Sequence, residues 1–315
     1  MKLKLANLPS RIEKLKLLSE ELGVNLYVKR DDMTGLELSG NKIRKLEYSL
    51  SEAKKLGADV IVTFGAIQSN HCRATAAACA KLGLECHLVL SADKPESYEG
   101  NLFLNALLGG HIHFIGDSDM KAYGEELGEK FKSEGRTPYF IPIGASNATG
   151  SLGYVEEAGE IIQWEEENVT FDLICLAVGS GGTYAGLFYG MAEAKRDVDI
   201  CGFSVSSESE VFVGKIGKIL GDMGMERLDR SKIWIDDEYV GLGYGKTTSG
   251  ELELIGDVAR KEGIILDPCY TGKAFIGMVD RIERGDFSKY KNILYIHTGG
   301  AFGWTKEHRD MFMDL

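Results

Sequence analysis

Seven short apolar runs, each bounded by turn residues, constrain the fold of this chain more than any other feature. They are the segments 59–65, 85–90, 111–116, 139–144, 171–179, 199–205 and 292–300. The runs are continuous and do not alternate with polar residues, which is typical of parallel strands buried on both faces of a sheet. Helical patterns lie between them, so the sequence predicts an α/β protein with mostly parallel sheets.

Four of the intervening segments carry clear helix signals. The stretch 42–57 repeats apolar residues at helical spacing and ends at Gly57, a residue suited to close a helix. Its expected apolar face consists of Ile43, Leu46, Leu50 and Ala53. The other segments are 70–83, 183–196 and 247–263, of which the last offers a Thr248–Glu251 capping box.

Composition narrows the class of protein. A length of 315 residues is typical of one large or two medium domains. The net charge of −12, from 36 Lys and Arg against 48 Asp and Glu, argues against binding to nucleic acid or to an anionic membrane. No apolar run resembles a signal peptide or a membrane span. The six cysteines form no Cys-x-x-Cys pair, so we expect reduced, buried thiols in a cytoplasmic protein and predict no metal ligand.

Lys42 stands where a helix begins, and this placement needs an explanation. Unpaired N–H groups and the helix dipole favour anions at such a position, yet Arg44 and Lys45 follow closely. One reading is a solvated lysine on a basic helix face. The other is a desolvated lysine near other cations, which has a lowered pKa and a reactive amine.

The segment 177–186, AVGSGGTYAG, follows a predicted strand and opens a predicted helix. Its side-chain-poor loop lets backbone amides converge on a phosphate; the loop residues are Gly179, Ser180, Gly181, Gly182 and Thr183. No Gly-Lys-Ser/Thr follows as in a Walker loop, and Tyr184 stands where the dinucleotide fingerprint needs glycine. A tight strand–helix turn is the alternative reading.

Two further turns are expected to lie between a strand and a helix, where ligands bind in parallel sheets. In GAIQSNHCR, Ser69, Asn70 and His71 could bind a carboxylate, or Ser69 and Asn70 could cap the helix while His71 is structural. The third turn combines LDPCYTGKA (266–274) with IHTGG (296–300). Its polar residues Tyr270, Thr271 and Thr298 also have plain structural readings as a core ring, a cap and a strand end.

Five motifs taken together are more specific than any one of them. SGNKIRKLE, AIQSNHCRATA, VGSGGTYAGL, LDPCYTGKA and IHTGG occur in this order along the chain. Their order and spacing resemble the D-cysteine desulfhydrase and 1-aminocyclopropane-1-carboxylate deaminase family of pyridoxal-phosphate enzymes. The resemblance runs from about residues 26–35 to the C-terminal strand. It implies pyridoxal 5′-phosphate as cofactor and the fold-type-II (tryptophan synthase β-like) architecture: two open, twisted, mostly parallel sheets flanked by helices.

The resemblance also assigns residues. Lys42 matches the Schiff-base lysine, the loop 179–183 matches the phosphate cup, and Asn70 matches the partner of the cofactor's phenolic oxygen. Substrate contacts are implied for Ser69, Asn70 and His71. The implied catalytic residues are Lys42, Ser69, Tyr270 and Tyr244, the last within GLGYG, and the implied cofactor contacts include Tyr270, Thr271 and Thr298.

Two threonines bear on the substrate. The deaminase branch has glutamate at the position of Thr271 and leucine at the position of Thr298. Threonine forms no charged pair with the pyridine nitrogen, so the ring is a weaker electron sink, which fits β-elimination of a good leaving group. Both threonines also resemble the D-cysteine desulfhydrase branch of the family, and this resemblance alone implies conversion of D-cysteine to pyruvate, ammonia and hydrogen sulfide. Lys42 and Tyr270 are both candidates for the base.

Several alternatives remain at this stage. The substrate could be 1-aminocyclopropane-1-carboxylate, L-cysteine or L-cysteate. A nicotinamide-dependent oxidoreductase is disfavoured by the failed fingerprint, and a non-catalytic cofactor-binding protein would not need Tyr270, Tyr244 and Ser69 together. The family comparison further implies a homodimer. It also implies a large domain of residues 1–47 and 155–315 with a small inserted domain of residues 48–154, and the cofactor in the cleft.

Overall fold

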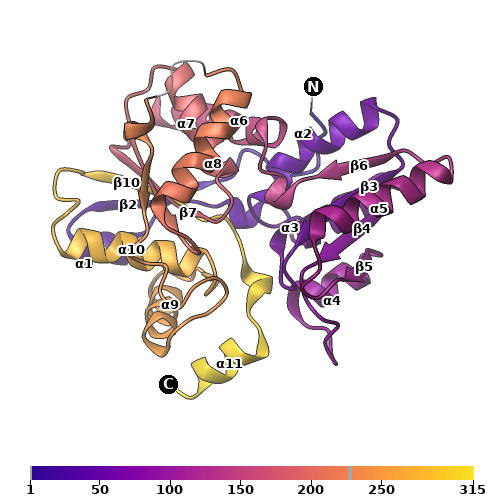
Figure 1. Ribbon diagram of the computed structural model, residues 1–315. Helices are drawn as coiled ribbons and strands as arrows, with labels where there is room; N and C mark the ends of the chain where they lie inside the picture. The colour runs from indigo at the N-terminus through magenta and orange to yellow at the C-terminus, as the bar shows by residue number, and fades with distance from the viewer. Residues whose placement is uncertain (1, 226–228) are drawn as a thin grey trace.

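The computed structural model describes residues 2–225 and 229–315, arranged as two lobes that each contain a sheet (Figure 1). The larger sheet has the order β1 (Ile12–Lys14), β2 (Asn25–Lys29), β10 (Asn292–Ile296), β7 (Leu173–Val178), β8 (Asp199–Ser204), β9 (Trp234–Asp236). The smaller sheet has the order β5 (His111–Phe114), β4 (Glu85–Leu90), β3 (Val60–Gly65), β6 (Pro138–Ile141). Only the β1–β2 pair is antiparallel among the described strands, so the predicted fold class is confirmed.

Helices cover both faces of each sheet. One face of the larger sheet packs against α1 (Lys16–Leu22), α9 (Ser249–Glu262) and α10 (Thr271–Glu283). The other packs against α6 (Ala148–Glu165), α7 (Gly182–Glu193) and α8 (Ser209–Asp222). The smaller sheet lies between α2 (Lys42–Lys55), α3 (Asn70–Leu82) and α4 (Gly100–Leu107) on one side and α5 (Met120–Ser133) on the other. The last helix, α11 (Lys306–Met313), lies near the C-terminus.

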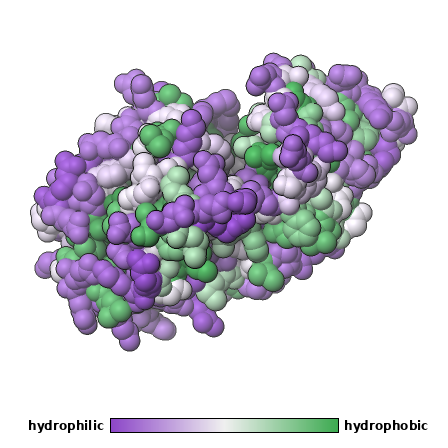
Figure 2. All heavy atoms as spheres, turned by 90° about the horizontal axis from the view of Figure 1, so that it is seen from below, coloured by the Kyte–Doolittle hydropathy of each residue, from purple (hydrophilic) through white to green (hydrophobic). Residues whose placement is uncertain are grey.

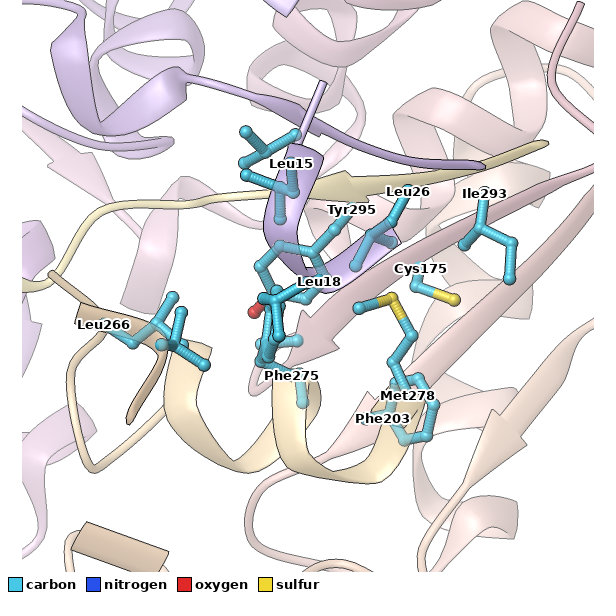
Figure 3. Packing of buried hydrophobic residues seen from close by; sticks show 14 of the residues in the cluster. Leu15, Leu18, Leu26, Cys175, Phe203, Leu266, Phe275, Met278, Ile293 and Tyr295 are labelled. Carbon is cyan, nitrogen blue, oxygen red and sulfur yellow. The ribbon is translucent and has the colours of Figure 1, made fainter. Parts of the chain in front are cut away.

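Strand β7 shows why the apolar runs are continuous. All six of its residues are buried. Leu173 and Cys175 belong to the cluster under α10, whereas Ile174 and Leu176 belong to the cluster under α7, because successive side chains point to opposite faces. Figure 3 shows the first cluster, in which Cys175 lies near Met278 of α10. A strand buried on both faces needs apolar residues at every position.

The predicted helix ends are well reproduced. Helix α2 begins at Lys42, and the four residues of its predicted apolar face are fully buried. Gly83 and Gly263 close α3 and α9 in the left-handed conformation, and Thr248 with Glu251 forms the predicted capping box. Gly57, with φ of 72°, lies two residues beyond Lys55, the last residue of α2. Each predicted helix is therefore present with ends within a few residues of those expected.

Six of the seven predicted apolar runs extend beyond the observed strands, whereas the run 85–90 coincides with β4, and one predicted turn has a different context. The run 292–300 forms a strand only as far as Ile296, and the run 139–144 turns at Pro142. The turn before α10 was expected to follow a strand, which is wrong: residues 263–267 have no regular structure. Asp267 holds this turn in place of a strand: its carboxylate accepts hydrogen bonds from the N–H groups of Cys269, Tyr270 and Thr271 at the start of α10.

Both predicted domain boundaries fall inside helices. The boundary at residues 47–48 lies within α2 and that at residues 154–155 lies within α6, and these two helices pack against each other. The four strands of the smaller sheet lie within residues 60–141, inside the segment expected to be inserted. The division into two domains stays a prediction.

The surface and the thiols agree with a globular chain. In the view of Figure 2, hydrophobic residues form separate patches among hydrophilic ones. No helix within the described residues is long and apolar enough to cross a membrane. All six cysteines are free thiols, and five of them are buried, as the sequence predicted.

Close packing of α6 against α7 generates a stability prediction. A Cβ at Gly186 of α7 would come within 2.5 Å of Tyr154 Cβ and would also meet the carbonyl oxygen of Ser151. Gly186→Ala should therefore lower the free energy of unfolding by about 1–3 kcal/mol through overpacking. Gly159→Ala is the matched control, since that helical glycine is exposed and has open space around it. It should stabilise α6 by about 0.5–1 kcal/mol. Denaturant midpoints measure both, and equal effects of the two changes would contradict the packing argument.

Candidate active site

A cavity of about 320 Å³ opens where strands of both sheets end. Gly65 ends β3, Ser91 follows β4, Gly179 follows β7 and Thr298 follows β10, and all four residues line it. The carboxyl ends of parallel strands therefore meet around one space, as expected for ligand sites in open sheets. The cavity also collects most of the candidate residues: Lys42, Ser69, Asn70, His71, Gly179, Ser180, Gly181, Thr183, Tyr244, Tyr270 and Thr298.

Lys42 lies at the first position of α2 and projects its amine into this cavity. The amine donates to Asn41 Oδ1 over 2.9 Å, while Asn41 Nδ2 donates to Thr183 Oγ1 over 3.1 Å. Burial, together with the nearby Arg73 charge, lowers the pKa of Lys42 to about 8. At pH 7 about one-tenth of this amine is therefore neutral and nucleophilic, a far larger share than for a lysine with the usual pKa.

Lys45 is a second cation beside the cavity, and it was not among the predicted site residues. Its side chain is fully buried, and Nζ contacts only Gly144 O at 3.3 Å and Ser146 Oγ at 3.2 Å in the described structure. Burial and the Lys42 charge hold the pKa of Lys45 well below its usual value. A buried ammonium without an acidic partner is costly, so this position suits a bound anion.

The glycine loop surrounds this anion position. A Cβ on Gly182, the first residue of α7, would lie 3.0 Å from Lys45 Nζ and 2.8 Å from Ser146 Oγ. Gly181 has φ of 88°, a conformation that favours glycine. Ser180 Oγ is 2.7 Å from Ser146 Oγ. Helix amides, hydroxyls and one ammonium thus converge where the sequence places a phosphate cup, and these residues fit the phosphate of pyridoxal 5′-phosphate.

The start of α3 forms the opposite wall. Ser69 Oγ accepts the N–H of Cys72 over 3.2 Å, so Ser69 caps the helix as well as lining the cavity. Asn101 Nδ2 donates to Asn70 Oδ1 over 2.9 Å. With its oxygen engaged, the Asn70 amide presents its NH₂ as a donor. The N–H groups of the helix start and of the Asn70 amide can donate hydrogen bonds to an anionic oxygen of a ligand.

His71 is held in one tautomer. Thr63 Oγ1 donates to Ile141 O over 2.8 Å, so its contact of 2.7 Å with His71 Nε2 must be a bond that the imidazole donates. Nδ1 is then a lone-pair acceptor, and it is buried without a partner in the described structure. Burial, with smaller effects of Lys42 and Lys45, keeps the pKa of His71 well below its usual value. His71 therefore offers the cavity a neutral acceptor.

Tyr270 and Tyr244 form a pair at the cavity wall. Their hydroxyl oxygens are 2.5 Å apart, and their rings meet edge to face with centroids separated by 5.6 Å. A Cβ on Gly179 would lie 2.9 Å from the Tyr270 ring, so this loop position favours glycine. Burial raises the pKa of both phenols, that of Tyr270 most strongly. Both hydroxyls are therefore neutral donors at ordinary pH.

The two threonines occupy different environments. Thr298 lines the cavity, whereas Thr271 is fully buried outside its lining. Thr271 Oγ1 donates to Asp267 Oδ1 over 2.7 Å and accepts the N–H of Asp267 over 2.8 Å. Gly182 also lies outside the lining. The structure thus brings together the predicted residues except Thr271 and Gly182, and the individual roles stay predictions.

Sequence reasoning missed three residues that shape the site. Asn41 and Lys45 both stand in the quoted motif SGNKIRKLE, where Asn41 directly precedes Lys42 and Lys45 follows it by three residues. Asp267 stands in LDPCYTGKA as a side chain that organises the start of α10. Lys45 carried the clearer signal, because it follows Lys42 by three residues on the same helix.

Two mostly parallel sheets whose strands end at one cavity, a lysine in that cavity, a glycine loop with an anion position and a pair of tyrosines together match a pyridoxal-phosphate enzyme site. A family model described as pyridoxal-phosphate dependent enzyme matches residues 3–299. The chain therefore belongs to this family, its cofactor is pyridoxal 5′-phosphate, and it is a lyase that acts on small amino acids.

Similar proteins narrow the family further. A bifunctional D-cysteine desulfhydrase/1-aminocyclopropane-1-carboxylate deaminase of Arabidopsis thaliana is 40% identical over 95% of this chain and 78% of its own. A D-cysteine desulfhydrase of Salmonella typhi is 39% identical over 95% of this chain and 94% of its own. A crystal structure of an ACC deaminase homologue superposes with a TM-score of 0.91 at 40% identity, covering 100% of this chain and 96% of that one. The predicted family is confirmed, whereas the homodimer and the cytoplasmic location stay predictions.

The lowered pKa of Lys42 predicts how the cofactor-free protein takes up its cofactor. Below pH 8 the amine is mostly protonated, and above it mostly neutral, and only the neutral form attacks an aldehyde. The rate of uptake, followed by the appearance of yellow colour, should rise with pH and level off above a midpoint of about 8. Lys42→Ala should show no such uptake, whereas the exposed Lys55→Ala on the same helix should behave as wild type. A midpoint at the usual lysine value would contradict the buried environment.

The two threonines should respond differently to loss of their hydroxyls. Thr298→Val removes a donor at the cavity wall, so turnover should fall about threefold to tenfold with little change in stability. Thr271→Val removes one donor to the buried Asp267 carboxylate and should lower the free energy of unfolding by about 1–3 kcal/mol. Steady-state rates and denaturant midpoints of the two variants provide the comparison. The reverse pattern would show that Thr271 is the threonine that faces the ligand.

Proposed function

We propose that this lyase catalyses β-elimination of D-cysteine. The overall reaction is D-cysteine plus water to pyruvate, ammonia and hydrogen sulfide. The observation that carries the proposal is the absence of any aspartate or glutamate from the described residues that line the cavity. Asp267, an acid whose charge acts on Lys42, lies outside this lining and is engaged by three backbone N–H groups and the Thr271 hydroxyl.

This charge pattern favours one kind of chemistry. Pyridoxal 5′-phosphate supplies an electron sink that stabilises negative charge at the substrate Cα. A carboxylate beside the pyridine nitrogen would strengthen that sink, and the polar group that this chain offers at the cavity near β10 is the uncharged Thr298. Expelling hydrosulfide, a good leaving group, demands less stabilisation than opening a cyclopropane ring. The uncharged wall therefore supports elimination from cysteine over ring opening.

The cavity also suits a small amino acid. Its volume of about 320 Å³ must accommodate the cofactor's reactive end and the substrate together, which limits the substrate to a short side chain. The start of α3, with Ser69 and Asn70, can bind the substrate carboxylate through backbone N–H groups and side chains.

Proton transfer is best assigned to Lys42. An amine with a pKa of about 8 exchanges protons readily near neutral pH, whereas the raised pKa values of Tyr270 and Tyr244 make both phenols poor bases. We assign removal of the Cα proton to Lys42. The Tyr244–Tyr270 hydroxyl pair then acts as a neutral hydrogen-bond donor to the departing sulfur or to the substrate carboxylate.

The preference for the D enantiomer rests on the relatives. Two of the similar proteins carry D-cysteine desulfhydrase in their names, and one of these also carries 1-aminocyclopropane-1-carboxylate deaminase. The second candidate function is therefore deamination of 1-aminocyclopropane-1-carboxylate, which the crystal structure of an ACC deaminase homologue also favours. The acid-free cavity is the reason to rank it second.

Product analysis tests the proposal. D-cysteine, L-cysteine, L-cysteate and 1-aminocyclopropane-1-carboxylate are each offered to the holoenzyme. Pyruvate and sulfide should appear in equal amounts from D-cysteine, at a rate at least about tenfold above that with the other substrates. Lys42→Ala should lower this rate by a factor of about 10²–10⁴, whereas Lys55→Ala should leave it unchanged.

Two outcomes would contradict the proposal. Release of 2-oxobutyrate from the cyclopropane substrate as the faster reaction would establish the second candidate and remove the argument from the uncharged wall. If both Lys42→Ala and Lys55→Ala released sulfide at the wild-type rate, Lys42 would not be the base.

A further inference from the structure

Three side chains with metal-ligand chemistry meet at the edge of the smaller sheet, away from the cavity. Glu85 and His87 are two residues apart on β4, so they point to the same face. His111 of β5 is the register partner of His87 across the parallel pair. The alternation of the two strands therefore places one carboxylate and two imidazoles together on the face that α5 covers, where His87 packs against Phe131.

The ligand atoms are close enough to share one ion. Glu85, His87 and His111 each offer one ligand atom, and these three atoms all lie within 4.8 Å of one another. Glu85 Oε1 is 2.7 Å from His87 Nε2 and 4.0 Å from His111 Nε2. The two imidazoles stack with centroids 4.6 Å apart and planes inclined by 14°. Because the two ring planes are nearly parallel, their in-plane lone pairs do not converge in this arrangement, so the exposed His111 ring has to turn toward Glu85 and His87 for the three ligands to share one ion.

A second layer of hydrogen bonds already supports His87. Its Nδ1 is 2.9 Å from His113 Nε2, and His113 Nδ1 is 2.9 Å from the Tyr123 hydroxyl. With an ion on Nε2, His87 donates its Nδ1–H to His113 Nε2, and His113 donates its Nδ1–H to the Tyr123 oxygen. Metal-ligating histidines require such an outer acceptor for their second nitrogen, which fixes the ring and its tautomer.

The local charge also suits a cation. Arg136 pairs with Glu85 Oε2 at 2.9 Å and with Asp59, so one guanidinium faces two carboxylates. One negative charge is left uncompensated, and Glu85 Oε1 is the oxygen that Arg136 does not engage. The side chains of His87, Glu85 and His111 are 8%, 31% and 58% exposed, which forms a graded path from solvent to the buried imidazole.

We propose that Glu85, His87 and His111 bind one Zn²⁺ ion, or a divalent transition metal of similar preference, with water as the fourth ligand. Two imidazoles and a carboxylate are a common donor set for zinc. The same set disfavours binding of Mg²⁺ and Ca²⁺, because both of these ions prefer oxygen ligands. The ion ties the edge strand β5 to β4. Sequence inspection predicts no metal ligand because each strand contributes only part of the set.

The site is independent of the catalytic cavity. Glu85 opens β4, whereas Ser91, which lines the cavity, follows its last residue. At about 3.3 Å per residue, His87 and Ser91 are separated by roughly 13 Å along the strand. The ion should therefore stabilise the fold and leave the rate of the proposed reaction unchanged.

Zinc titration of the chelator-treated holoenzyme tests the proposal. Calorimetry should show one Zn²⁺ bound per chain, and the thermal midpoint should rise with Zn²⁺ and not with Mg²⁺. His111→Ala should weaken zinc binding at least about tenfold. Because that side chain is mostly exposed, the variant should keep its fold and its yellow colour. Glu85→Gln removes one negative charge and one ligand and should also weaken zinc binding. Glu134→Gln is the matched control, because it removes the same charge at an exposed position two residues before Arg136, and it should bind zinc as wild type.

Two results would overturn the proposal. Zinc that binds with wild-type affinity to both His111→Ala and Glu85→Gln would place the ion elsewhere, for example on the cysteines or the cofactor. A holoenzyme whose calorimetric signal and thermal midpoint do not respond to Zn²⁺ would show that the cluster is only a hydrogen-bonded sheet edge.

Discussion

The candidate active site depends on two desolvated lysines that lie beside one cavity whose described lining contains no acidic side chain. Lys42 and Lys45 lie one helical turn apart at the start of α2, and no aspartate or glutamate of the described chain lines the cavity beside them. Burial and the Lys42 charge lower the pKa of Lys45, and burial with both lysine charges lowers the pKa of the neighbouring His71. A covalent bond to an aldehyde would remove the charge at Lys42, and a phosphate would offset that at Lys45. One cofactor that carries both groups would therefore relieve both sources of instability.

The surrounding fold is arranged to bring those lysines to the ends of the strands. Helix α2 packs on the smaller sheet through its apolar face, while Arg44 on another side forms a buried ion pair with Asp31, with its guanidinium 2.9 Å from the carboxylate. Asp31 follows β2 of the larger sheet, so this pair joins the two lobes at the base of the site. Breaking one partner of such a pair leaves a buried charge uncompensated, which makes the placement of α2 strongly specified.

Much of this architecture could be predicted from the sequence. The parts that could not be predicted have one cause in common. The apolar runs and the caps at Gly83, Thr248 and Gly263 are local signals, and the structure confirms them. The absence of a strand before Tyr270 was not predictable, because Asp267 shapes that turn through its side chain. Lys45 was missed for a similar reason: its burial depends on the approach of Ser146 and Gly182, which are distant in sequence. Periodicity reports which face of an element is buried, but not which polar group of another element meets it there.

The same distinction explains how one parallel sheet can carry two different kinds of polar site. At the carboxyl ends of its strands, backbone amides and helix starts converge, so the smaller sheet contributes anion-binding groups such as those around Ser69 and Asn70. Toward the opposite ends no such dipoles converge, and the polar groups must be side chains in register, as Glu85, His87 and His111 are. Anion recognition by backbone and cation recognition by side chains are thereby separated along a single strand, β4. The separation lets the edge of the sheet be stabilised without placing an acid near Lys42, where a carboxylate would raise the lysine pKa and suppress its reactivity.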